Sequence, residues 1–158
     1  MIAPNIDEST LRDESPRAYA LRMALQKLVT AEGFVVAADT VVAAGARILP
    51  KAETEAQARQ CLALLSGRRH KVYTGVAVRA PGGKVASRVV ASVVGFARLD
   101  SGQLQEYLDS GEWAQKAGGY AIQGRAAVFV DFISGSYSAV VGLPLHETAA
   151  LLRGLGWR

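Results

Sequence analysis

Asp39 and Thr40 are the first residues of this sequence whose positions suggest chemistry. They follow the apolar, valine-rich run 34–38, which has the composition of a buried strand. In α/β sheets, ligands collect beyond the carboxyl ends of strands, where a carboxylate can bind a divalent cation or activate a water molecule. The alternative is that Asp39 caps a turn, so its role depends on what the rest of the chain offers.

Other charged residues could act together with Asp39. Asp7 and Glu8 form an acidic pair ahead of the first expected helix, and magnesium sites use one or two carboxylates together with substrate phosphates. Lys51 precedes another expected helix, where its ammonium could meet a phosphate. Arg68 follows a helix end, where a cation also has a structural explanation. Taken singly, the acidic pair and the lysine are equally typical of solvent-exposed loops.

The segment 116–124 has the composition of a loop that approaches a ligand. Three glycines fall within seven residues, which indicates close backbone approach or strained turns. Gln123 lies between Ile122 and Gly124 and carries both a donor and an acceptor, as reading the edge of a base requires. A glycine-rich turn with an exposed polar residue is the alternative. A second loop, 135–144, carries hydroxyls into a helix start, and such starts bind anions.

Helices and strands that must position these residues are mixed along the chain. Ser15 and Pro16 predict a helix start, and Thr54 with Gln57 predicts a capping box for a second helix. The expected helices are 16–33, 54–67, 101–110 and 144–152, and the expected strands are 34–38, 70–80, 85–99 and 126–133, with a hairpin turn at 81–83. This order predicts an α/β or α+β class with a mixed sheet.

Composition narrows the class of protein further. The chain has 158 residues, half of them hydrophobic, which fits one domain with a substantial core. Its apolar runs are too short to cross a bilayer, and no secretory signal is evident. Cys61 is the single cysteine, which excludes an internal disulfide and makes a cytoplasmic location the default. We interpret His70 and His146 as structural, because neither has a partner pattern for a metal site or a triad.

The net charge of +4 fits either a nucleic-acid surface or a cleft for a small polyanion such as a triphosphate. The cations are scattered and no basic stripe alternates with aromatics, so nucleic-acid binding is disfavoured. A homodimer is expected only as the commonest oligomer.

Taken together, these motifs resemble the Maf family of nucleotide pyrophosphatases. The resemblance runs in family order through the blocks 5–8, 38–42, 65–68, 74–77, 116–118, 122–124 and 135–144. It implies an α/β fold with an elongated mixed sheet, flanking helices and a cleft between two lobes. It also implies that residues 1–158 form a single Maf-like domain.

The resemblance further implies hydrolysis of a nucleoside triphosphate to the monophosphate and pyrophosphate, assisted by Mg²⁺ or Mn²⁺. Asp39 matches the catalytic acidic residue, Glu8 a residue that assists metal or water binding, and Lys51 a motif lysine. Asp39 and Glu8 are thus the expected metal ligands. Thr40 and Gln123 match positions of substrate choice, in the pattern of the branch that acts on dTTP and UTP. Arg68 and Lys116, within matching blocks, are the further expected substrate-binding residues.

One departure from the family pattern concerns the start of the sequence. Family members begin with a strand and a Ser-x-Ser-Pro-Arg-Arg loop that grips phosphates, whereas this sequence opens at Met1-Ile2-Ala3-Pro4. We expect an exposed edge on a neighbouring strand. A late start codon or a shortened gene product would explain the difference. The alternative to an active enzyme is therefore an impaired Maf-like protein that binds nucleotides or acts as an interaction protein in cell division.

Overall fold

Five strands form the sheet that carries the rest of the molecule. The computed structural model describes residues 6–158, so Asn5 of the block 5–8 lies outside the described residues. The strands are β1 (Val35–Ala44), β2 (Arg47–Leu49), β3 (Arg69–Arg79), β4 (Val85–Phe96) and β5 (Val130–Ser134). They lie in the order β2-β1-β3-β4-β5, and all four pairings are antiparallel. The expectation of a mixed sheet was therefore wrong, because the chain reverses direction between every pair of neighbouring strands.

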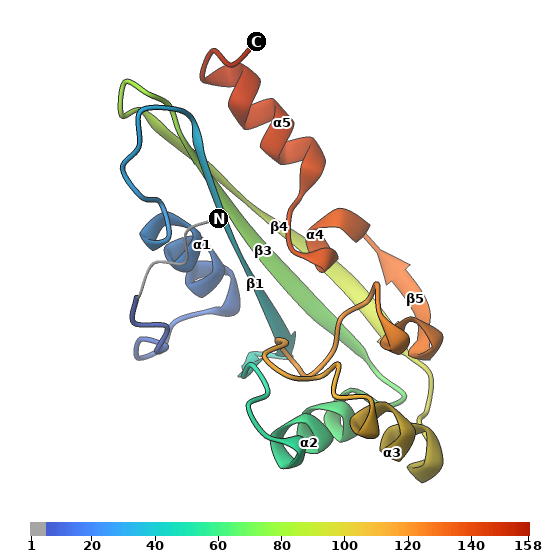
Figure 1. Cartoon of the computed structure of the whole chain (residues 1–158). Helices are drawn as coiled ribbons and strands as arrows, with labels where there is room; N and C mark the ends of the chain where they lie inside the picture. The colour runs from blue at the N-terminus through green and yellow to red at the C-terminus, as the bar shows by residue number, and fades with distance from the viewer. Residues whose placement is uncertain (1–5) are drawn as a thin grey trace.

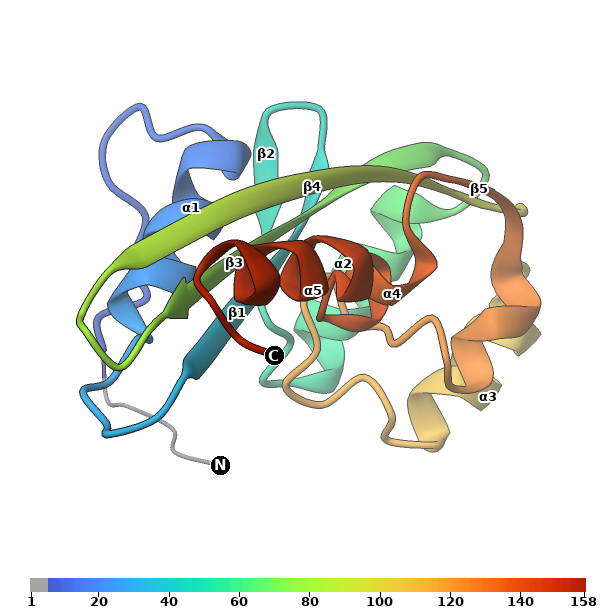
Figure 2. The same cartoon turned by 90° about the horizontal axis from the view of Figure 1, so that it is seen from above.

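Helices cover both faces of this sheet, which confirms the α/β class. They are α1 (Pro16–Gln26), α2 (Glu55–Leu65), α3 (Ser101–Asp109), α4 (Tyr137–Val141), α5 (Leu145–Gly154) and the 3₁₀ helix η1 (Arg125–Phe129). In Figure 1, α5 lies beside the end of the long strands that carries the β3–β4 turn, and α2 and α3 lie at the opposite end. Seen from above in Figure 2, α1 and α5 lie on opposite sides of the strands. None of the helices within residues 6–158 has the length and hydrophobicity needed to span a bilayer.

Alternation along β3 assigns these helices to their faces. Val76 and Val78 pack with Leu151 of α5, and Val72 belongs to the large core cluster that includes Leu62 of α2. Gly75 points the other way, against the backbone of α1. Side chains of a strand alternate between its faces, so α1 covers one face of β3 and α2, α4 and α5 cover the other.

Local sequence signals set most element boundaries. The predicted capping box of Thr54 with Gln57 is present at α2, and the structure has a second one, Asp100 with Gln103, at α3. The predicted hairpin is confirmed as β3 and β4. Four expected boundaries were wrong. The strand expected at 34–38 continues to Ala44, and part of the strand expected at 126–133 is η1. The helix expected at 16–33 ends at Gln26, and the strand expected at 85–99 ends at Phe96. The first extends because residues 41–44 are valine and alanine, which fit a buried strand as well as the residues before them do.

One edge of the sheet is partly open beside the middle of β1. β2 pairs only with Val42, Ala43 and Ala44. Within the described part of the chain, residues 35–41 of β1 therefore have no strand partner on that side. An exposed edge on a strand was expected from the sequence, and the structure has one next to Asp39.

A polar pair lies inside the large core cluster. His70 is 3% exposed, and its Nε2 is 2.7 Å from the hydroxyl of Tyr120. The ring of Phe96 contacts both side chains edge-on. Burial lowers the pKa of His70 to about 4, so the pair is neutral at physiological pH, and the structural interpretation of His70 agrees with its position.

This buried histidine predicts a specific acid sensitivity. An unfolded chain takes up a proton at His70 near pH 6.5, while the folded protein does so only near pH 4. As the pH is lowered between these two values, the free energy of unfolding should fall by about 1.4 kcal/mol per pH unit from this group alone. The measurement is urea unfolding at several pH values. His70→Gln should lose this component and the exposed His146→Gln should keep it; parallel curves for His70→Gln and wild type would contradict the prediction.

Candidate active site

β1 divides the predicted site residues between its two faces. Asp39 pairs with Gly75 and faces α1, whereas Thr40 pairs with Thr74 and faces α4. The Thr40 hydroxyl is 3.0 Å from that of Thr74, which donates to the carbonyl of Ala139 in α4. Asp39 was expected just beyond a strand end, and that was wrong, because it lies in the middle of β1. Asp39 is 8% exposed, and two pockets include it in their lining.

A lysine that the sequence reasoning missed organises the charges around Asp39. The Lys27 ammonium donates to Oδ1 of Asp39 and lies 2.9 Å from Oε1 of Glu8. Lys51 in turn donates to Oε2 of Glu8 at 2.5 Å. The structure thus brings together the three predicted catalytic residues, Asp39, Glu8 and Lys51, and Lys27 joins two of them directly.

Lys27 continues the buried stripe of α1, and this was the signal available in the sequence. The helix buries Tyr19, Ala20, Met23 and Ala24. Lys27 follows Met23 and Ala20 at helical spacing on that face and caps the helix at its C-terminus. The larger apolar residues Leu21 and Leu25 lie outside this buried set, and Leu25 is 39% exposed.

The two carboxylates of this cluster are shifted in opposite directions. Burial raises the pKa of Asp39 above its usual range, and the opposing influence of Lys27 and Lys51 does not cancel this shift. The hydrogen bond from Lys51 lowers the pKa of Glu8, with Lys27 acting in the same direction. Pairs of acids whose environments separate their pKa values are typical of acid–base chemistry. Asp39 is therefore the better proton acceptor, and Glu8 remains ionised.

Two pockets meet at Asp39. One has a volume of about 640 Å³ and includes Glu8 and Tyr19 on the α1 side. The other, of about 210 Å³, includes Gln123 and contains three further polar or charged side chains of loop 115–123. Both pockets are lined by Asp39, Thr40, Lys51 and Ala117. A ligand that occupied both would cross β1 at the Asp39 carboxylate.

The glycine-rich segment closes the smaller pocket. Ala117 forms a β-bridge with Lys51, and the amide of Gly118 donates to the carbonyl of Pro50 at 3.0 Å. Gly118 has φ +66°, and a Cβ there would lie 2.9 Å from the side chain of Val42, so close backbone approach does require this glycine. The loop brings Lys116 and Gln123 into the same pocket as Thr40.

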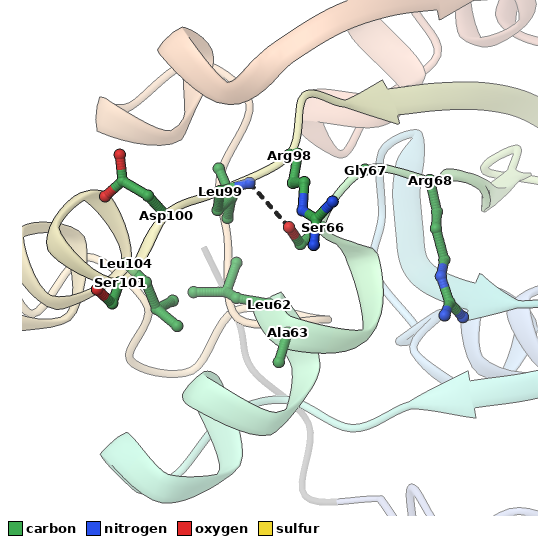
Figure 3. Close-up of a pocket in the computed structure, with 10 residues that line it drawn as sticks. All are labelled: Leu62, Ala63, Ser66, Gly67, Arg68, Arg98, Leu99, Asp100, Ser101 and Leu104. Atoms are coloured by element: carbon green, nitrogen blue, oxygen red, sulfur yellow. Dashed lines mark hydrogen bonds between the residues drawn. The ribbon is translucent and has the colours of Figure 1, made fainter.

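Arg68 lies elsewhere in the molecule. It lines a pocket of about 580 Å³ between α2 and α3 that also contains Arg98. In the view of Figure 3, Arg98 lies next to Ser66 and Arg68 lies farther along the chain, beyond Gly67. The hydroxyl of Ser66 accepts a hydrogen bond from the Leu99 amide at 2.8 Å. Arg68 immediately precedes β3, and Gly75, the partner of Asp39, is six residues beyond Arg69. At a rise of about 3.3 Å per residue this separation is about 20 Å, so the structure does not bring Arg68 to the Asp39 cluster.

A divalent cation would find an incomplete but suitable set of ligands here. Among residues 6–158, no three side chains of His, Cys, Asp or Glu converge on one point. Asp39 and Glu8 are linked through Lys27 and supply carboxylate oxygens. Magnesium commonly takes one or two carboxylates and completes its shell with substrate phosphates and water. Because the Lys27 ammonium contacts both carboxylates, an ion that arrived with its substrate and bound both would displace this ammonium.

Comparison with known proteins gives a consistent result. The family model described as "Maf-like protein" matches residues 1–155. A dTTP/UTP pyrophosphatase of Caulobacter vibrioides is 58% identical over 98% of this chain and 82% of its own length. One of Granulibacter bethesdensis is 55% identical over 99% and 83%, respectively. A nucleoside triphosphate pyrophosphatase of Anaplasma marginale is 49% identical over 98% and 81%.

The contact between β3 and α1 predicts that Gly75 cannot be enlarged. A Cβ at this position would lie 2.3 Å from the carbonyl oxygen of Ala20, so Gly75→Ala must push α1, which carries Lys27, off the sheet. We expect a loss of about 1–3 kcal/mol in the free energy of unfolding, the usual cost of overpacking. Gly33→Ala is the control, since a Cβ there meets nothing within 4 Å. If denaturant midpoints were equal for both variants, the close approach would be wrong.

Proposed function

Because this chain belongs to the Maf family, we propose that it hydrolyses nucleoside triphosphates, preferentially dTTP and UTP, to the monophosphate and pyrophosphate. The observation that carries the proposal is the buried Asp39 carboxylate, held by Lys27 where two pockets meet. The names of the relatives supply the substrate class. We take residues 1–158 as one catalytic domain, because a single sheet runs through its described part.

Asp39 is the general base of this reaction. Oδ1 accepts from Lys27, while Oδ2 has no hydrogen-bond partner among residues 6–158 and is available to a water molecule. The water loses a proton to Asp39 and its oxygen attacks the α phosphorus. The bond from that phosphorus to the bridging oxygen breaks, and pyrophosphate leaves with the bonding electrons. The raised pKa of Asp39 supports this role, because a stronger base accepts the proton more readily.

Cations balance the charge that develops on the leaving group. Lys51 is 40% exposed at its side chain and can turn from Glu8 toward a phosphate. Lys27 lies deeper, between the two carboxylates. A bound Mg²⁺ or Mn²⁺, held by Asp39 and Glu8, would neutralise phosphate oxygens further. Fixed charges of this kind stabilise a phosphoryl-transfer transition state more than any covalent step does.

Base selection belongs to the smaller pocket. Gln123 offers an amide donor and acceptor, which complement the O4 acceptor and N3–H donor of uracil and thymine. Cytosine presents the opposite pattern at these positions. Thr40 and Lys116 line the same pocket and complete its polar wall. A pocket built on such hydrogen bonds rejects bases that leave its groups unpaired. The proposal leaves Arg68 outside the substrate site, because it lies in a separate pocket.

The general-base role predicts the effect of Asp39→Asn. The amide preserves shape but cannot accept the proton, so pyrophosphate release from UTP and dTTP should fall at least about 100-fold. The assay is pyrophosphate release with added Mg²⁺ or Mn²⁺, and Asp109→Asn, at the exposed end of α3, is the control. Unchanged activity of Asp39→Asn would refute the assignment.

Binding of UTP without hydrolysis by the wild type would instead favour the alternative, an impaired nucleotide-binding protein.

Lys27 should set the pH at which the enzyme becomes active. Activity rises with pH as Asp39 loses its proton, and Lys27 lowers the pKa of that carboxyl against the effect of burial. Lys27→Met removes the cation, so the pKa of Asp39 rises further and the acidic limb of kcat/KM against pH should move to higher pH. Lys84→Met, in the exposed β3–β4 turn, should leave the limb unchanged. A limb that stays in place or moves to lower pH in Lys27→Met would contradict this account.

A further inference from the structure

Tyr120 connects the buried core to the loop that carries Gln123. Its ring is 6% exposed and packs against Phe96, and its hydroxyl reaches Nε2 of His70 at 2.7 Å. At the same time Tyr120 lines the smaller pocket together with Gln123 and Thr40. One side chain therefore belongs both to the core and to the wall of the site, and His70 is the polar group that fixes its outer end.

Two buried side chains and four hydrogen bonds of the terminal glycines hold this part of the loop. Ile122 is 5% exposed and belongs to the large core cluster, like Tyr120. The amide of Gly119 donates to the carbonyl of Lys116 at 2.9 Å, and its carbonyl accepts from the Tyr107 hydroxyl at 3.1 Å. The amide of Gly124 donates to the carbonyl of Ala121, and its carbonyl accepts from the amide of Ala127, both at 3.0 Å. Gln123 itself is exposed, and its amide has no hydrogen bond within residues 6–158. Its location therefore follows from the two buried residues before it, Tyr120 and Ile122, of which Tyr120 is the one held by a side-chain hydrogen bond, to His70.

We propose that the buried His70–Tyr120 hydrogen bond positions Gln123 and thereby sets the preference for uracil and thymine over cytosine. The inference rests on the proposed function and extends it to two residues that touch neither the reacting atoms nor the phosphates. His70 and Tyr120 are positioning residues. They lie on the opposite face of β1 from Asp39, Glu8 and Lys27, so they control base recognition separately from the chemistry.

The energetics of a buried hydrogen-bonded pair allow an effect on base preference to be distinguished from an effect on folding stability. Removing one partner leaves the other buried and unpaired, which is unfavourable, whereas replacing both partners by apolar groups is nearly neutral. His70→Phe should therefore drive the Tyr120 hydroxyl toward the pocket. The double variant His70→Phe/Tyr120→Phe should leave the ring in place, and His70→Gln should retain a partner for the hydroxyl.

The experiment compares kcat/KM for UTP with kcat/KM for CTP in wild type and these variants, at a temperature where circular dichroism shows all of them folded. We expect the UTP:CTP ratio to fall about 10-fold in His70→Phe, the factor that about 1.4 kcal/mol represents. The change should appear in KM for UTP, with kcat little altered. The double variant and His70→Gln should recover most of the ratio.

Two controls separate positioning from loss of stability and from failure of the proposed function. Val78→Ala, buried on the same strand but packed against α5, should lower stability without changing the ratio. Gln123→Ala should abolish the preference. A wild-type ratio in folded His70→Phe, with the preference lost in Gln123→Ala, would overturn the inference and leave the proposed function intact. If the wild type hydrolysed nothing, dissociation constants for UTP and CTP would replace kcat/KM, and no preference in wild type would overturn the inference.

Discussion

The contact between the Lys27 ammonium and two carboxylates is the interaction on which the rest of the site depends. Asp39 is buried, and a buried carboxylate without a partner would take up a proton and lose its value as a base. Lys27 keeps the ionised form within reach while the loss of surrounding water keeps its basicity high. The same ammonium links Glu8, from the segment before α1, to the middle of β1. The segment before α1, the end of α1 and the middle of β1 thus meet at the Lys27 ammonium.

Small residues make that contact possible. α1 approaches the sheet through Ala20 and Ala24 rather than through its leucines, and Gly75 provides the space opposite Ala20. A larger residue in place of Gly75 would separate the helix from β3. Lys27 could then no longer reach Asp39, which pairs with Gly75 on the neighbouring strand. The electrostatics of the site therefore depend on a close backbone contact.

Sequence patterns predicted the parts of this structure that are local. The hairpin of β3 and β4 and the capping box of α2 follow from residues a few positions apart. Residue chemistry suggested that Glu8 and Lys51 could act with Asp39, but their selection over the solvent-exposed alternative came from family resemblance, since no local pattern relates them. Lys27 could not be found in this way, because α1 packs on the sheet through alanines instead of its leucines, and a lysine at a helix end has no local pattern that points to a partner on β1. Arg68 was expected to bind substrate because it lies in a block that matches the family. A motif contains no information on distance, and in the structure the length of β3 separates Arg68 from Asp39.

The two pockets also give a physical reason for the bond that is cleaved. In a nucleoside triphosphate the α phosphate lies between the base with its sugar on one side and the β and γ phosphates on the other. The pocket with Gln123 suits the base, and the larger pocket with Lys51 suits the outer phosphates. The residues common to both pockets include Asp39, so a nucleotide that filled both would have its α phosphorus beside the Asp39 carboxylate. Under the proposed function, water activated there would attack the α phosphorus and cut between the α and β phosphates, rather than at the terminal phosphate.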